Sequence, residues 1–147
     1  MVAYYDDPEK KIVKKDLFSD YAHEIAKNLA KKEEYRTKSG KKRFRTNTLS
    51  QIRKFYDDLL RIKMSIQLKR NGLERSKEEN EEFIRKLPYI KMMKAKVSYA
   101  LSRDKITKDF YDFINENVDY IKDIDDFFTF CNLFEAIIAY SSQYLKS

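Results

Sequence analysis

The sequence predicts an all-α protein, a single-domain bundle of about five to six helices over residues 1–147. Two glycines and two prolines are too few for the turns of a multistranded sheet. Apolar residues recur at helical spacing along most of the chain. The chain also has 11 tyrosines and 10 phenylalanines among its 147 residues, which is enough material for one buried core.

The expected helices are bounded by local signals that favour helix starts and ends. These signals are Thr48 with Gln51, Asn71–Gly72 at a helix end, Ser76 with Glu79, and Pro88 at the first position of a helix. The expected helices cover residues 16–32, 49–69, 76–86, 88–102, 105–120 and 125–145.

Two segments lack the one-sided apolar pattern of an ordinary amphipathic helix. Residues 34–47 are polar, contain Gly40 and lack apolar periodicity, so we expect a basic, mobile loop there. The last helix is apolar on most of its circumference, which places it either at the centre of the bundle or against another subunit.

The net charge of +7 is concentrated in one part of the chain. Residues 35–56 hold eight bases and no acid, which leaves 23 bases against 24 acids elsewhere. Such clustering is typical of a polyanion-binding site. Residues 104–147 hold nine acids against four bases, so copies of the chain could attract one another head to tail; an acidic solvated surface explains this equally well.

The composition excludes several kinds of chemistry. One cysteine (Cys131) and one histidine (His23) cannot form a zinc finger or a disulfide scaffold, and the chain has no glycine-rich phosphate loop. The acidic run Asp123-Ile124-Asp125-Asp126 fits helix capping better than metal binding. We therefore expect no enzyme activity, no metal and no cofactor. No apolar stretch is long enough for a membrane span, and we expect a soluble, cytoplasmic protein.

Binding of a nucleic acid is better supported. Met92, Lys96, Tyr99 and Arg103 are spaced i, i+4, i+7, i+11 on one side of the expected fourth helix, where cations flank a ring that can stack on bases. A solvated cationic face is the alternative. Intrahelical ion pairs could explain the bases of the second helix, but not the acid-free segment before it. The candidate RNA-binding residues are Lys41, Lys42, Arg43, Arg45, Gln51, Arg53, Lys54, Arg61, Lys94, Lys96, Tyr99 and Arg103.

Three blocks of the sequence resemble a known family. Residues 48–56 (TLSQIRKFY), 87–103 (LPYIKMMKAKVSYALSR) and 130–140 (FCNLFEAIIAY) are similar, in this order, to the small subunit of type III-A CRISPR interference complexes, the Csm family. The 45 N-terminal residues show no recognisable match, so the role of the expected loop rests on its charge.

The resemblance implies an all-helical, non-catalytic subunit. It also implies that several copies stack into a filament beside the backbone subunits that hold the guide RNA, and that they support the target strand without reading its sequence. In such a complex, cutting of the target RNA is expected to belong to the neighbouring backbone subunit. By position within the matching blocks, the residues expected to face RNA are Gln51, Arg53, Lys54 and Arg103. Phe134, Glu135 and Tyr140 could be core or intersubunit residues.

The sequence thus favours a non-catalytic RNA-binding structural subunit of a type III-A CRISPR complex. Its expected partners are single-stranded target RNA, guide RNA, the other subunits and further copies of itself. A helical DNA-binding regulator is one alternative, which would require base-reading side chains and usually a symmetric dimer. A protein–protein scaffold that uses the last helix and binds no nucleic acid is the other.

Overall fold

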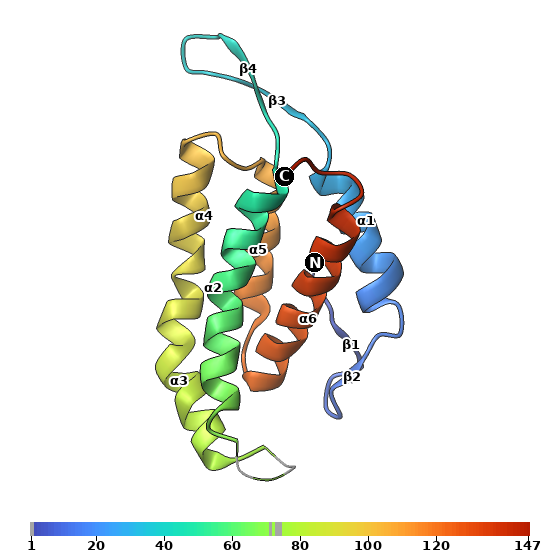
Figure 1. The fold of residues 1–147 in the computed structure, drawn as a ribbon, viewed down its shortest axis with the longest axis vertical. Helices are drawn as coiled ribbons and strands as arrows, with labels where there is room; N and C mark the ends of the chain where they lie inside the picture. The colour runs from blue at the N-terminus through green and yellow to red at the C-terminus, as the bar shows by residue number, and fades with distance from the viewer. Residues whose placement is uncertain (1, 71, 73–74) are drawn as a thin grey trace.

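The computed structural model describes residues 2–70, 72 and 75–147. Its helices run mainly along the long axis of the molecule, and the predicted all-helical fold is confirmed (Figure 1). The helical elements are the π-helical turn η1 (Leu17–Tyr21), α1 (Ala22–Leu29), α2 (Leu49–Gln67), α3 (Lys77–Lys91), α4 (Met93–Ser102), α5 (Lys108–Tyr120) and α6 (Ile124–Ser141).

Helix α6 lies at the centre of the bundle. It packs against α1 and α2, and its rings Phe130 and Phe134 meet Phe113 of α5 at centroid distances of 5.8 and 5.6 Å. Its exposed positions carry Asn132, Glu135 and Ala139 and no large apolar side chain. Of the two placements expected for this apolar helix, the central one is therefore correct, and Phe134 is a core residue.

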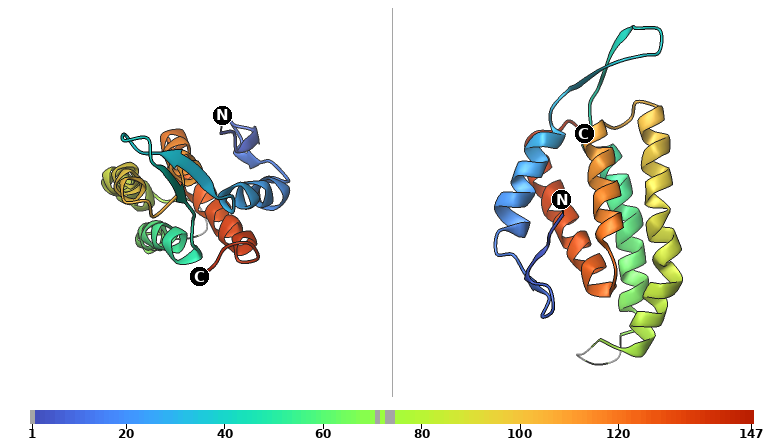
Figure 2. Two further views of the ribbon diagram at one scale, coloured as in Figure 1. Left: turned by 90° about the horizontal axis from the view of Figure 1, so that it is seen from above. Right: turned by 180° about the vertical axis from the view of Figure 1, so that it is seen from behind.

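The boundary between the third and fourth helices differs from the prediction. Pro88 lies inside α3 rather than at a helix start, and the break falls at Met92. A proline removes the donor for the carbonyl four residues earlier, here that of Ile84. Both residues are exposed, so water can bind that carbonyl. Helices α3 and α4 consequently follow each other end to end in one column (Figure 2).

Two short hairpins were not predicted. β1 (Tyr5–Asp7) pairs with β2 (Ile12–Val13), and β3 (Glu33–Arg36) pairs with β4 (Lys42–Arg45). The second hairpin replaces the irregular loop expected over 34–47, and it projects beyond one end of the bundle (Figure 1). Its strands are too short for an alternating pattern to stand out in the sequence.

The other helix boundaries agree with the prediction at two helix starts and differ from it at two helix ends. Helix α1 ends at Leu29, earlier than expected, and α2 ends at Gln67. The expected end at Asn71–Gly72 falls partly outside the described residues, because Asn71 is not among them. The Ser76–Glu79 capping box is confirmed, and the Thr48 hydroxyl accepts the backbone N–H of Gln51.

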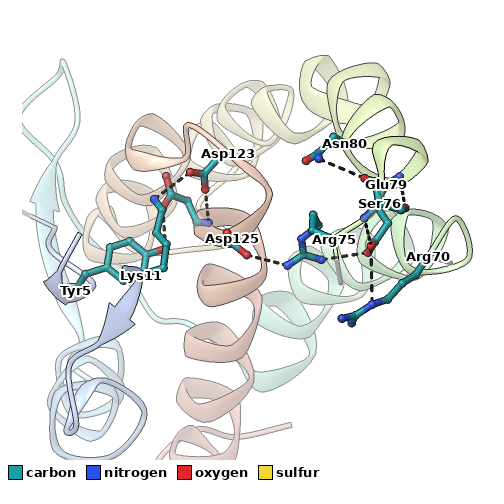
Figure 3. Close-up of polar contacts among 10 residues, drawn as sticks. Tyr5, Lys11, Arg70, Arg75, Ser76, Glu79, Asn80, Asp123 and Asp125 are labelled. Atoms are coloured by element: carbon teal, nitrogen blue, oxygen red, sulfur yellow. Dashed lines mark hydrogen bonds and ion pairs between the residues drawn. The ribbon is translucent and has the colours of Figure 1, made fainter. Parts of the chain in front are cut away.

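The acidic run before α6 has structural partners. The Asp123 carboxylate accepts the Asp126 backbone N–H at 2.9 Å, which confirms the capping interpretation, and it also pairs with Lys11 (Figure 3). Arg75 joins Asp125 (2.7 Å) to the buried Glu79 of α3 (3.1 Å). These carboxylates fix the lower end of the bundle, where α3 and α6 begin.

Candidate nucleic-acid interface

A groove of about 540 Å³ lies between α2 and α4, towards the end of the bundle that carries the β3–β4 hairpin. Its walls are side chains from these two helices that offer a mostly apolar surface with charged ends, and the buried Phe55 and Ala100 form its floor. We call it the α2–α4 groove. Its lining residues are Gln51, Lys54, Phe55, Asp58, Met92, Ala95, Lys96, Tyr99, Ala100, Arg103 and Lys105.

Helix α4 supplies the predicted stripe. Met92, Lys96, Tyr99 and Arg103 all line the groove, because Val97 and its neighbours at core spacing turn the opposite side of the helix inward. Tyr99 is 64% exposed, which leaves its ring accessible. Arg103 Nη1 donates to the Tyr99 hydroxyl at 3.0 Å. The ring and the guanidinium are thus held side by side.

Helix α2 forms the other wall through residues one helical turn apart. Gln51, Lys54 and Asp58 line the groove, while the buried Ile52 and Leu59 face the core. Lys96 Nζ lies 3.0 Å from Asp58 Oδ2, so an ion pair joins the two walls. The two walls therefore place Gln51 and Lys54 of α2 opposite the predicted stripe of α4.

Three of the predicted residues on the helices lie outside this groove. Arg53 is exposed on the side of α2 near Tyr56, whose ring packs edge-on against Phe134 of α6. Lys94 is turned towards α5, where it pairs with Asp119 at 2.6 Å. Arg61 pairs with Asp58 and lines a second hollow further along α2. The helices bring Gln51, Lys54, Lys96, Tyr99 and Arg103 together, and they separate these three.

The predicted bases of the hairpin have two different environments. Lys41, Lys42 and Arg43 are exposed at or near its tip, where Lys42 pairs with Glu34 of the opposite strand at 3.2 Å. Arg45, at the base of the hairpin, is only 15% exposed in its side chain. The tip therefore offers free surface for an anion, whereas Arg45 is engaged within the protein.

Arg45 connects the hairpin to the end of α4. Its Nε donates to Asp104 Oδ1 at 2.8 Å, and its guanidinium lies 3.7 Å from the ring centroid of Tyr35. A hydrogen bond from the Tyr35 hydroxyl, assisted by Arg45, holds the pKa of the Asp104 carboxyl below its usual range. Because Asp104 directly follows Arg103, this contact fixes the hairpin beside the α2–α4 groove.

Sequence reasoning missed part of this surface. Lys105 reaches the groove because Asp104 adopts a left-handed turn (φ 58°) after α4. Lys86 and Tyr89 line the second hollow, which continues the groove along α3. Tyr89 is spaced three and seven residues before Met92 and Lys96, so helical periodicity could have found it. The expected helix over residues 88–102 already contained Tyr89, so this spacing was present in the sequence and was overlooked.

Other kinds of site find less support in the described part of the chain. No group of three or more His, Cys, Asp or Glu side chains there is arranged to hold a metal ion. None of the helices in that part combines the length and apolar character that crossing a membrane requires.

Comparison with known protein families identifies a relationship. Residues 13–147 match the family model described as Csm2 Type III-A, which includes the hairpin and α1 as well as the three blocks noted in the sequence. No curated protein and no solved structure matches the chain significantly. The chain therefore belongs to the Csm2 family of type III-A CRISPR effector subunits.

Proposed function

We propose that this protein is a non-catalytic structural subunit that binds the RNA backbone of its CRISPR complex through the α2–α4 groove and the β3–β4 hairpin. The observation that carries the proposal is the position of Tyr99, an exposed ring with Lys96 and Arg103 on either side in one groove. Its partners are single-stranded target RNA, guide RNA, the other subunits and further copies of the chain. We place this role in the cytoplasm.

The chemistry of the groove suits single strands of any sequence. Lysine and arginine side chains bind phosphates, and an exposed aromatic ring stacks on any base. Gln51 is the one side-chain amide among the lining residues, so little of the surface is suited to reading base edges. Binding through phosphates releases counterions and weakens steeply as salt rises.

The two side chains whose chemistry would best suit catalysis, His23 and Cys131, are held in packing contacts. His23 stacks on Tyr140 at 4.5 Å, and its Nε2 is hydrogen-bonded to the Tyr144 hydroxyl at 2.7 Å. Burial raises the pKa of Cys131 to about 12, so its thiol stays protonated and unreactive. These surroundings support a role in holding RNA and leave its cleavage to another subunit.

Repetition of the chain would strengthen weak contacts. When several copies lie along one RNA, each further copy binds at a high effective concentration, and total affinity rises without new contacts. The acidic hollow between α1 and α5, lined by Asp109, Asp112 and Glu116, could receive the basic surface of a neighbouring copy. This supports self-association as part of the proposed role.

A salt titration tests the proposal. Binding of the full chain to a labelled, unstructured single-stranded RNA is measured by filter binding across a range of salt. We expect Lys54→Ala with Arg103→Ala to weaken binding and to lower the slope of log K against log salt by about 1.4, from about 0.7 per phosphate contact. The matched control, Lys77→Ala with Lys122→Ala, removes the same charge at the far end of the bundle.

The outcomes are distinct. Affinity that does not change with salt, or equal losses in both double variants, would contradict a phosphate-binding groove. Preference for duplex DNA with a defined site would favour the DNA-binding regulator instead. Arg53→Ala adds a further comparison: the resemblance implies that Arg53 faces RNA, whereas its position outside the groove predicts a smaller loss than for the neighbouring Lys54→Ala.

A further inference from the structure

The α2–α4 groove is continuous with a second hollow. This hollow, of about 280 Å³, is lined by residues of α2 and α3 that include Arg61, Lys86 and Tyr89. It shares Asp58, Met92 and Lys96 with the first groove. A strand that follows the groove towards α3 therefore passes directly over Asp58.

Asp58 differs in charge from its surroundings. Among the residues that line the two hollows in the described part of the chain, six are bases and Asp58 is the only acid. Those bases are Lys54, Arg61, Lys86, Lys96, Arg103 and Lys105. A carboxylate at the junction of two cationic hollows repels a polyanion, so plain electrostatic complementarity does not account for it.

The two oxygens of Asp58 bind one cation each. Oδ2 accepts from Lys96 Nζ of α4 at 3.0 Å, and Oδ1 accepts from Arg61 Nη2 of α2. A phosphate bound between the same two side chains would use its two non-bridging oxygens in this way. The carboxylate therefore occupies the place that the charges around it would otherwise give to a phosphate.

We propose that Asp58 is a built-in competitor for phosphate, which occupies Lys96 and Arg61 in the free protein and limits the affinity of each copy for RNA. This inference rests on the proposed function. When RNA binds, a backbone phosphate takes over one or both cations, and the ion pairs are given up at small cost because both cations are exposed to water, which screens them. Weak single-copy binding lets affinity depend on assembly along the RNA.

Asp58→Asn tests this directly, because it keeps the size of the side chain and removes its charge. We expect single-stranded RNA to bind roughly three- to ten-fold more tightly at low salt, as estimated from two exposed ion pairs. The salt slope should steepen by about 0.7 to 1.4, because one or two phosphate contacts are then no longer offset by a carboxylate that loses its partners. The matched control is Asp57→Asn, the same change of charge at the neighbouring exposed position outside both hollows.

A double-mutant cycle provides a readout that a purely structural role would not change. In the wild type, Lys96→Ala should weaken RNA binding little, because Asp58 already occupies Lys96. In the Asp58→Asn background the same substitution should cost several-fold more. Thermal melts of each variant show whether the bundle is intact.

The outcomes separate the two proposals. Equal gains from Asp58→Asn and Asp57→Asn indicate a net-charge effect and overturn the role of Asp58. A wild type that binds RNA, with an Asp58→Asn variant that binds no more tightly, overturns this role alone. If neither protein binds RNA even at low salt, both this inference and the proposed function are overturned.

Discussion

Arg45 of the hairpin donates to Asp104, the residue that follows the groove-lining stripe of α4, across a distance of 2.8 Å. Arg45 was predicted to bind RNA. Its guanidinium instead contacts Asp104, Glu33 at 3.4 Å and the face of the Tyr35 ring. The contact gives it a positioning role: it holds the basic tip of the hairpin beside the groove.

Loss of this contact should loosen the hairpin. We expect Arg45→Ala to cost about 1–2 kcal/mol, since a half-buried charge-assisted hydrogen bond and a cation–π contact are removed together. Amide hydrogen exchange of residues 33–45 should accelerate, while exchange in α5 and α6 stays unchanged. The control is Lys42→Ala, which removes an exposed pair with Glu34. Equal effects of the two substitutions would contradict the positioning role.

Asp126 should contribute more to stability than either neighbouring acid. Asp126 is only 3% exposed. Its carboxylate accepts hydrogen bonds from the Tyr5 hydroxyl (2.7 Å), Lys11 Nζ (3.0 Å) and the Lys122 backbone N–H (3.0 Å). Asp126→Ala leaves the Tyr5 hydroxyl and the Lys122 N–H without this acceptor, leaves Lys11 with Asp123 alone, and should cost about 3 kcal/mol in urea denaturation. Asp125→Ala, at a more exposed pair with Arg75, should cost less than about 1 kcal/mol.

The same carboxyl predicts a dependence of stability on pH. Burial raises the pKa of Asp126, but hydrogen bonds from Tyr5, Lys122 and Lys11 outweigh it, and the pKa lies below its usual range. A depressed pKa contributes stability above the unfolded value of about 3.9. This contribution is lost as the pH falls through the folded value. Asp126→Asn should therefore flatten the decline in unfolding free energy below about pH 4. An unchanged acid profile would contradict this assignment.

The helical part of the fold could be predicted because its determinants are local. Apolar spacing identified the long helices, and the capping residues Thr48 and Ser76 identified two of their starts. The hairpins depend on contacts distant in sequence, as with Arg45 and Asp104, and their strands are too short to show a pattern. Pro88 misled the prediction because a helix tolerates proline where the freed carbonyl is solvated.

The candidate site could be predicted only in part, for a geometric reason. Successive residues of a helix are about 100° apart, so adjacent bases point in different directions. Helical spacing correctly grouped Lys96, Tyr99 and Arg103, but only the packing of neighbouring helices shows what each face meets. Lys94 thus turned out to face α5, and Lys54 rather than Arg53 lines the groove.

Tyr99 should contribute to RNA binding through its ring. We expect Tyr99→Ala to weaken binding of single-stranded RNA by about 1–3 kcal/mol, the usual value of one base–aromatic stack. Tyr99→Phe keeps the ring and loses only the hydrogen bond from Arg103, so its affinity should stay near that of the wild type. Inorganic polyphosphate, which has no bases, should bind the wild type and both variants alike. A loss with polyphosphate equal to that with RNA would contradict stacking.

The tip of the hairpin should contribute to RNA binding through its positive charge. Replacing Lys41, Lys42 and Arg43 together by alanine should lower the salt slope for single-stranded RNA by about 2, from about 0.7 per phosphate contact. The loss should be the same for RNAs of different sequence, because contacts to phosphates carry no sequence information.

The other hairpin provides a matched control for this variant. Lys10, Lys14 and Lys15 are also exposed, and they lie beside β1 and β2 rather than near the groove. Their replacement by alanine removes the same three charges and should leave the slope nearly unchanged. Equal slopes in the two triple variants would mean that RNA responds to net charge alone. An unaltered slope after the tip substitutions, together with loss of assembly between copies, would assign the tip to subunit contact.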